Sequence, residues 1–255
     1  MNRQFTTKIL LSLKIDLPDF NAACELIISK AKKKEKGFVC FANVHMLIEA
    51  HRNNFISDAI NNSFLTLPDG MPIVKSMGSL FNIKCERVAG MDIFPVLLNH
   101  CEKENLSVFF FGTTNELLKK IKAKAIVEFP KLKIAGAFSP PFNKQINDPS
   151  YIDLINKASP DMVFVALGCP KQELWMNENY SNINSLLLGV GGAFPVYAQS
   201  VKRAPEIFRK LSLEWLFRLF QEPRRLFKRY FYTNTYFILL YSRLKLKLLF
   251  SSENG

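Results

Sequence analysis

The sequence predicts an α/β fold, in which a mostly parallel sheet carries helices on both faces and is followed by a basic, aromatic, helical C-terminal appendage. The first observation is the alternation of short apolar runs with helix-forming stretches over residues 5–190. The second is that runs such as 37–42 and 107–111 are apolar throughout, which is typical of strands covered on both faces. After residue 199 no buried strand is expected. We therefore divide the chain into a Rossmann-like core, 1–199, and an appendage, 200–255.

The order of the expected elements follows from boundary signals. Residues 5–15 are expected to form one strand, and Asp19 is expected to cap a helix that ends before Gly37. Asp148 followed by Pro149 marks the start of a later helix. The remaining strands are expected at 37–42, 64–67, 107–111, 132–136, 162–167 and 185–190, and the remaining helices from about residues 46 and 71 and at 93–103, 115–129 and 172–179.

Composition excludes several classes of protein. A hydrophobic content of 48% excludes a disordered chain. The five cysteines are scattered and without CxxC pairing, which argues against a disulfide framework or a zinc site and favours a reducing cytosol. The three histidines lack HExxH spacing and no Asp-x-Asp pair is present, so we expect neither a metal nor a cofactor. The N-terminal apolar run is too short for a signal peptide, and we expect a cytoplasmic protein.

The appendage concentrates the positive charge of the chain. The net charge is +12, and residues 200–255 contain twelve Lys or Arg, four Glu and twelve aromatic residues. Nucleic acids and anionic membrane surfaces both bind such a mixture, so composition leaves both partners open. The apolar run 230–241 is shorter than the ~20 residues of a spanning helix. Since basic residues interrupt it at 243, 245 and 247, a helix lying in the membrane interface is the better interpretation.

Polar and glycine-rich segments follow the expected strands. In an open parallel sheet, ligands bind beyond the carboxyl ends of the strands. The chain lacks GxxxxGK[ST], and Phe194 stands where a third glycine would complete the pattern that begins at Gly189, so kinase, ATPase and dinucleotide interpretations lose support. Glycines at strand ends let backbone amides approach a phosphate or a ribose. The segments are 42–45, 68–70, 112–114, 136–137, 168–173 and 189–192.

Asp69 is the acid best placed for chemistry. It follows a short strand and precedes Gly70, so its carboxylate could take a proton from a substrate hydroxyl. The alternative is that Asp69 only caps the next helix. Asn43 has a similar pair of interpretations, as a turn residue or as a partner of a sugar hydroxyl. Residues 171–173 could read a uracil edge or cap a helix, whereas His45 and Cys169 are expected to be packing or loop residues.

Several sequence blocks in register resemble one enzyme family. They are LPDGMPIV (67–74), ERVAGMD (86–92), FFFGTT (109–114), VALGCPKQELW (165–175), LLLGVGGAF (186–194), RAPE (203–206) and LEWLFRLFQEPRRLFKRY (213–230). Together they resemble the WecG/TagA/CpsF family, glycosyltransferase family 26. The resemblance implies an inverting, metal-independent transfer of one sugar from a UDP-sugar to a polyprenyl-diphosphate-linked sugar in cell-surface polysaccharide synthesis. An N-acetylmannosamine-type sugar or its uronic acid is expected, with glucose or glucuronic acid as the alternative.

The resemblance also implies roles for individual residues. Asp69 matches the catalytic base, Arg87 a phosphate-binding arginine and Asn43 the family's asparagine, and these three form the expected catalytic set. Gln172 matches a further site residue. Appendage cations that close over the diphosphate match Arg218 and Arg225, with Lys228 or Arg229 as the third. With the arginines and strand-end residues found above, the expected substrate-binding set is Gly112, Thr113, Gly136, Gln172, Glu173, Gly191, Gly192, Arg203, Arg218, Arg225 and Arg229.

Two departures from the family pattern bear on substrate preference. Phe41 stands where a threonine is common, and Pro195 stands where an acid often follows the GVGGAF block. The expected partners are a UDP-sugar, a polyprenyl-diphosphate-linked acceptor and an anionic membrane surface at the inner face of the plasma membrane. No nucleic acid partner is expected, and self-association is left open. The rival hypotheses are a nucleic-acid-binding protein and a non-catalytic nucleotide-sugar scaffold.

Overall fold

The computed structural model describes residues 5–141, 146–210 and 213–252. The strands are β1 Thr7–Leu10, β2 Leu13–Asp16, β3 Gly37–Ala42, β4 Leu65–Pro68, β5 Ser107–Gly112, β6 Lys133–Phe138, β7 Met162–Ala166 and β8 Leu186–Gly189. The helices are α1 Phe20–Lys32, α2 Val44–Arg52, α3 Asn54–Asn61, α4 Met71–Phe81, α5 Gly90–Lys103, α6 Asn115–Glu128, α7 Pro149–Ala158, α8 Lys171–Asn179, α9 Ala193–Tyr197, α10 Glu206–Lys210, α11 Glu214–Gln221 and α12 Pro223–Ser252.

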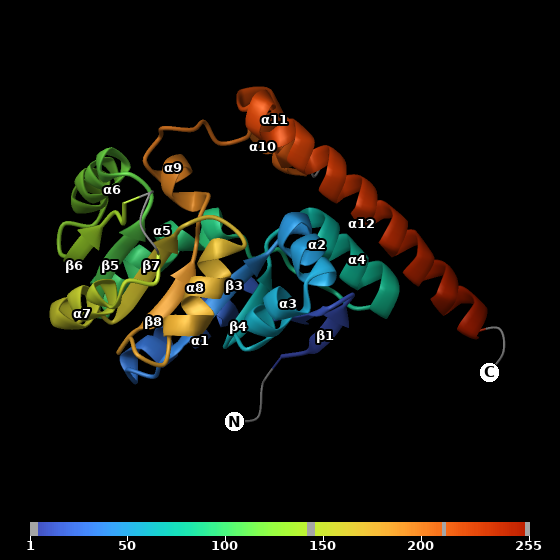
Figure 1. The fold of residues 1–255 in the computed structure, drawn as a ribbon. Helices are drawn as coiled ribbons and strands as arrows, with labels where there is room; N and C mark the ends of the chain where they lie inside the picture. The colour runs from blue at the N-terminus through green and yellow to red at the C-terminus, as the bar shows by residue number, and fades with distance from the viewer. Residues whose placement is uncertain (1–4, 142–145, 211–212, 253–255) are drawn as a thin grey trace.

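A six-stranded sheet forms the centre of the core, with strand order β4-β3-β8-β7-β5-β6 (Figure 1). Every pairing within it is parallel, so all the carboxyl ends of the strands lie along one edge. The predicted α/β class with a mostly parallel sheet is confirmed. Strands β4, β3, β8 and β7 are consecutive neighbours in the sheet. The segments that follow them, 68–70, 42–45, 189–192 and 166–169, therefore lie side by side at that edge.

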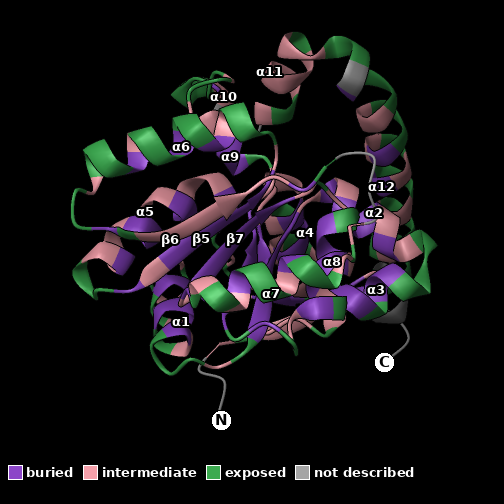
Figure 2. Cartoon of the chain, turned by 60° about the vertical axis from the view of Figure 1, so that its left-hand side comes forward, coloured by how far each residue is buried: buried purple, intermediate pink, exposed green. Residues whose placement is uncertain are grey.

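Helices cover both faces of the sheet, as the uniformly apolar strands predict (Figure 2). One apolar cluster joins the sheet to α1, α5, α6 and α9, and the other joins it to α2, α3, α4, α7 and α8. Within β3, Val39 and Phe41 belong to the first cluster, while Phe38 and Cys40 belong to the second. Because alternate residues of one strand pack on opposite faces, the sheet edge is held rigidly from both sides.

The structure differs from the sequence prediction at the N-terminus. Residues 5–15 were expected to form one strand, but the chain folds into an antiparallel hairpin of β1 and β2. Leu11 adopts a left-handed backbone with φ of 54°, and the chain reverses there. No glycine marks this turn, so the sequence carried no signal for it. A second difference is the break at Asn53, where the helix expected from about residue 46 divides into α2 and α3.

The C-terminal segment consists of α10, α11 and the long helix α12, which packs along α2 and α4 (Figure 1). Phe237 is buried in this contact, and the Tyr241 hydroxyl hydrogen-bonds Ser79 Oγ at 2.9 Å. The guanidinium of Arg52 lies 5.1 Å from the ring centroid of Tyr232. Among the residues that the structure describes, none of the helices is both long and apolar enough to cross a membrane.

Candidate active site

A cavity of about 650 Å³ opens at the carboxyl ends of β3, β4, β7 and β8 and is walled on its outer side by α11 and α12. This volume is in the range of sites that enclose a cofactor-sized ligand. The cavity therefore lies at the sheet edge that parallel topology predicts, and the C-terminal helices supply part of its wall. The predicted site residues that line it are Asn43, Asp69, Arg87, Thr113, Gln172, Glu173, Gly191, Gly192, Arg218 and Arg229.

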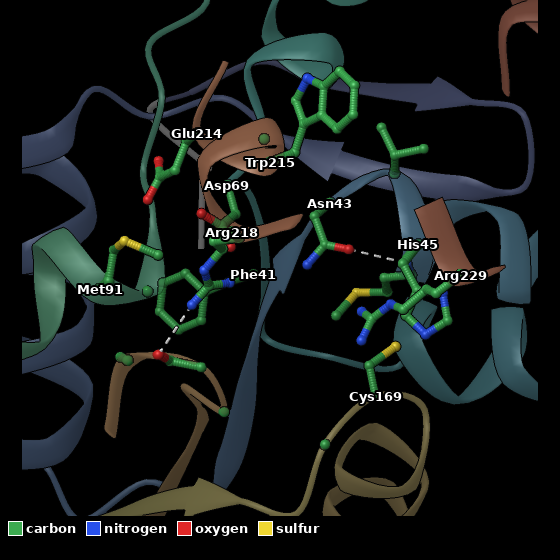
Figure 3. Close-up of a pocket in the computed structure, with 18 of the residues that line it drawn as sticks. Phe41, Asn43, His45, Asp69, Met91, Cys169, Glu214, Trp215, Arg218 and Arg229 are labelled. Carbon is green, nitrogen blue, oxygen red and sulfur yellow. Dashed lines mark hydrogen bonds between the residues drawn. The ribbon is translucent and has the colours of Figure 1, made fainter. Parts of the chain in front are cut away.

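Asp69 lies in this cavity at the end of β4 (Figure 3). Its backbone N–H donates to the Ala42 carbonyl at 2.9 Å, which ties the loop to the end of β3. The alternative interpretation, a helix cap, is wrong: Gly70 is the N-cap residue of α4 and no side chain caps that helix. Among the described residues, no hydrogen bond or ion pair is recorded for the Asp69 carboxylate. The carboxylate is thus held at the sheet edge by its backbone while its oxygens face the cavity.

The surroundings of Asp69 favour its protonated form. The pKa of the Asp69 carboxyl is raised to about 7, chiefly by burial, with the positive charge of Arg87 opposing the shift, the negative charge of Glu214 adding to it and Arg218 opposing it. The side chain keeps contact with the cavity although protein atoms surround it on the other sides. A carboxylate with a pKa near neutrality is a much stronger base than an ordinary aspartate and is still ionised in an adequate fraction of molecules at pH 7.

Arginines from both parts of the chain lie around Asp69. Arg87, from the loop before α5, forms ion pairs with Asp92 and, at 3.4 Å, with Glu214 of α11. Arg218 of α11 donates to the carbonyl of Gly192 at 3.4 Å. The core and the C-terminal segment therefore contribute cations to the same place. Planar guanidinium groups bind phosphate oxygens through paired hydrogen bonds, so this group of residues suits a diphosphate.

Glu214 lines the cavity, but the sequence analysis did not predict this. There it was counted only as one of the four acidic residues of the appendage. It lies one helical turn before Arg218 in α11, and both side chains line the cavity with Trp215. The spacing of four residues was the available signal, since residues i and i+4 share a face of a helix. Figure 3 shows Glu214 and Arg218 on the same side of the cavity as Asp69.

Asn43 is both a turn residue that caps a helix and a residue of the cavity wall, the two positions between which the sequence did not decide. Its Oδ1 accepts a hydrogen bond from the backbone N–H of Met46 at 3.1 Å, so the side chain caps α2. It also lines the cavity, and no partner is recorded for its Nδ2 among the described residues. With the oxygen occupied by the cap, the group that Asn43 can offer to a ligand is the N–H donor.

Gln172 and Glu173 lie where α8 begins, under the loop that follows β8. Neither side chain caps α8, so the helix-cap alternative for this segment is wrong. Gln172 Nε2 donates to Glu173 Oε1 at 2.7 Å and to the carbonyl of Gly189 at 2.9 Å. Glu173 is fully buried, and burial raises the pKa of its carboxyl. These contacts join α8 to the end of β8.

His45, Cys169 and Arg229 form the other end of the cavity wall (Figure 3). Burial lowers the pKa of His45 to about 4, and the charge of Arg229 lowers it as well, so the imidazole is neutral at pH 7. Burial raises the pKa of the Cys169 thiol, which keeps it from acting as a thiolate nucleophile. Both residues were expected only to pack or to shape loops, and both line the cavity. Of the two candidates for the third appendage cation, Arg229 lines the cavity and Lys228 is exposed.

Other predicted residues are not on the cavity wall. A Cβ at Gly112, where φ is +105°, would lie 2.4 Å from the Ala166 carbonyl oxygen, and one at Gly136 would lie 2.5 Å from the Phe109 ring. Both glycines therefore serve strand packing. Arg203 pairs with Asp92 beside the cavity, and the side chain of Arg225 lies outside the described part of the structure. Within the described ranges, no three His, Cys, Asp or Glu side chains are grouped to hold a metal ion.

Comparison with known proteins shows the family to which the chain belongs. The model of the glycosyl transferase WecG/TagA/CpsF family matches residues 8–250. The N-acetylglucosaminyldiphosphoundecaprenol N-acetyl-beta-D-mannosaminyltransferase of Bacillus subtilis (strain 168) is 35% identical over 187 residues, covering 72% of this chain and 71% of the relative. The protein of the same name from Bacillus spizizenii (strain ATCC 23059 / NRRL B-14472 / W23) is 33% identical over 190 residues, covering 74% and 72%. The chain therefore belongs to the WecG/TagA/CpsF family and is a glycosyltransferase.

Proposed function

We propose that this glycosyltransferase moves N-acetylmannosamine from UDP-N-acetylmannosamine to N-acetylglucosamine carried on a polyprenyl diphosphate, with inversion at the anomeric carbon. The observation that carries the proposal is the Asp69 carboxylate, which faces the cavity with a pKa of about 7 beside Arg87 and Arg218. The names of the two Bacillus relatives supply the sugar and the acceptor. The product belongs to a cell-surface polysaccharide.

The proposed reaction is a single displacement. The Asp69 carboxylate takes the proton of the acceptor hydroxyl while that oxygen attacks the anomeric carbon of the donor sugar. The bond from the anomeric carbon to the diphosphate oxygen breaks, and UDP leaves with the bonding electrons. Arg87 and Arg218 stabilise the charge that develops on the diphosphate, an effect for which one well-placed group contributes about 3 kcal/mol. Attack opposite the leaving group inverts the configuration.

We further propose that the C-terminal helices hold the enzyme on an anionic membrane, at the cytoplasmic face where a polyprenyl-linked acceptor is anchored. One face of α12 packs on α2 and α4, while other α12 side chains are exposed. Exposed aromatic rings next to cations suit the headgroup region of an anionic bilayer. The exposed residues that would meet it are Phe227, Lys228, Phe231, Ile238, Lys245, Leu246, Lys247 and Phe250.

The donor sugar is tested by measuring UDP release. The purified chain is incubated with a short-chain polyprenyl-diphosphate N-acetylglucosamine and, in turn, with the UDP derivatives of N-acetylmannosamine, N-acetylmannosaminuronic acid, glucose and glucuronic acid. We expect release with UDP-N-acetylmannosamine to exceed that with each of the others by at least about tenfold, because a site that pairs a substrate's polar groups rejects analogues lacking them. NMR of the product should show an inverted linkage. Faster turnover of another donor, or a retained configuration, would overturn the proposal.

A further inference from the structure

The orientation of the Gln172 amide is fixed by its two partners. Its Nε2 lies 2.7 Å from Glu173 Oε1 and 2.9 Å from the Gly189 carbonyl oxygen. A carbonyl oxygen can only accept, so the nitrogen of the amide, and not its oxygen, must face Gly189. The nitrogen carries two hydrogens, and these two contacts use both of them. The amide therefore has no hydrogen left to donate to a ligand.

The oxygen of the same amide has no hydrogen-bond partner among the residues that the structure describes. Gln172 is 4% exposed, and its Oε1 is a buried acceptor without a hydrogen bond. A Cβ on Gly191 would lie only 3.1 Å from this oxygen, so the glycine allows the loop that follows β8 to pass close to Oε1. Gln172 and Gly191 both line the cavity. A buried acceptor without a partner destabilises the protein unless a bound molecule supplies a donor.

Glu173 is the most deeply buried of these wall residues. It is 0% exposed, so its carboxyl reaches a ligand only through a neighbouring side chain. Its Oε1 accepts the hydrogen bond of Gln172, and the Cys169 thiol lies beside it. A carboxyl in full burial is costly, and here hydrogen bonds from the Gln172 amide and the Cys169 thiol offset part of that cost.

We propose that Glu173 is a positioning residue, which fixes the Gln172 amide so that Oε1 accepts a hydrogen bond from an N–H or O–H group of the nucleotide-sugar donor. This inference rests on the proposed function. The oxygens of the diphosphate carry no hydrogen and cannot bind there, so Gln172 contacts another part of the donor. The chemical candidates are the imide N–H of uracil, a ribose or sugar hydroxyl, and an acetamido N–H. The diphosphate is left to Arg87 and Arg218.

The experiment compares Glu173→Met, Glu173→Gln, Gln172→Met and the double variant Gln172→Met/Glu173→Met. Glu173→Met removes the acceptor that holds the amide, and we expect the KM for the UDP-sugar to rise on the order of tenfold with little change in kcat. Glu173→Gln keeps an acceptor oxygen and should retain a KM close to that of the unaltered chain. If Glu173 acts through Gln172, the double variant should be no weaker than Gln172→Met alone.

Two outcomes would overturn the inference. Additive losses in the double variant would show that Glu173 acts independently of Gln172, and a Glu173→Gln variant as weak as Glu173→Met would show that charge, and not amide orientation, matters. Should Glu173→Met fail to fold, Gln172→Met with an unchanged KM, or Glu173→Gln with a raised one, contradicts the inference equally. Thermal unfolding of each variant identifies a folding defect.

Calorimetric titration with UDP alone separates the possible contacts. Weaker UDP binding by Gln172→Met assigns the contact to uracil or ribose, whereas unchanged UDP binding with a raised KM assigns it to the sugar. Unaltered protein that binds no UDP would contradict the proposed function itself. Unaltered protein that binds UDP and transfers sugar, with all variants equal to it, would contradict only this inference.

Discussion

Asp69 shows how one position can combine a conformational requirement with a chemical one. The residue ends β4, and its backbone is fixed to β3, so the carboxylate is placed without using its own oxygens. Burial raises its pKa to about 7. A base is active when ionised, so kcat/KM should rise with pH and level off above about pH 7, falling about tenfold per pH unit below it. Steady-state kinetics between pH 5 and 9 check this, and an acid limb near pH 4 would contradict it.

The same pKa shift predicts that an ionised Asp69 lowers the free energy of unfolding. The folded pKa of about 7 lies above the ordinary value of 3.8, so the folded state binds more protons between these values. Stability therefore falls as pH rises through this window. Asp69→Asn should raise the unfolding free energy at pH 8 by about 1–3 kcal/mol, discounted for partial exposure, and by much less at pH 4. Thermal unfolding at both pH values measures this, with exposed Asp58→Asn as the control. Equal gains at both would contradict it.

Among the elements, α11 connects the C-terminal segment to Asp69, the proposed base. Glu214 pairs with Arg87, and its charge raises the pKa of Asp69. Glu214→Gln removes that charge, so the acid limb of kcat/KM should move to lower pH. The pH profile of this variant checks the shift, and Glu116→Gln, which changes an exposed side chain of α6, serves as the control. An unmoved limb in Glu214→Gln would show that α11 does not act on Asp69.

Helix α12 should hold the chain on anionic lipid through its exposed aromatic residues. Phe227 and Phe231 are 61% and 68% exposed, and their rings stack one turn apart. The double variant Phe227→Ser/Phe231→Ser should lose at least about tenfold in affinity for vesicles of anionic phospholipid, since both rings leave the interface. Sedimentation with vesicles measures this loss.

The matched control for the vesicle experiment is Phe55→Ser, which removes a ring of similar exposure, 60%, from α3. UDP binding should be unchanged in both proteins. Vesicle binding that survives in the double variant, or that excess RNA abolishes, would favour the rival interpretation of the basic segment as a nucleic-acid surface.

At the scale of the whole molecule, the sequence predicted the parallel sheet and the end of the sheet at which the cavity lies. Uniformly apolar strands required cover on both faces, and parallel strands required a shared ligand-binding edge, so Asp69 and Asn43 were expected there. What it could not predict depends on contacts distant along the chain. The pairing of Glu214 with Arg87 joins residues 127 positions apart, and the hydrogen bond from Gln172 to Gly189 requires the crossover between β7 and β8.

Glycines show the same limit of prediction from sequence. Gly112 ends β5 and Gly136 lies in β6, positions near strand ends where a glycine could bind a ligand. Neighbouring protein atoms already occupy the space beside both glycines. Gly191 and Gly192 have the same local signature and line the cavity. Only the packing of β5 against β7 and β6 distinguishes the two pairs, and no local pattern records it.

The central claim is that Asp69 is the base of a sugar transfer in a cavity that already binds the donor. The rate of single-turnover transfer from UDP-N-acetylmannosamine by Asp69→Asn tests it, with UDP affinity by calorimetric titration of the same preparation as the control. We predict UDP affinity within about threefold of the unaltered chain and a transfer rate lower by about 10²- to 10⁴-fold, the usual effect of losing a general base. Transfer at an unchanged rate would contradict the claim.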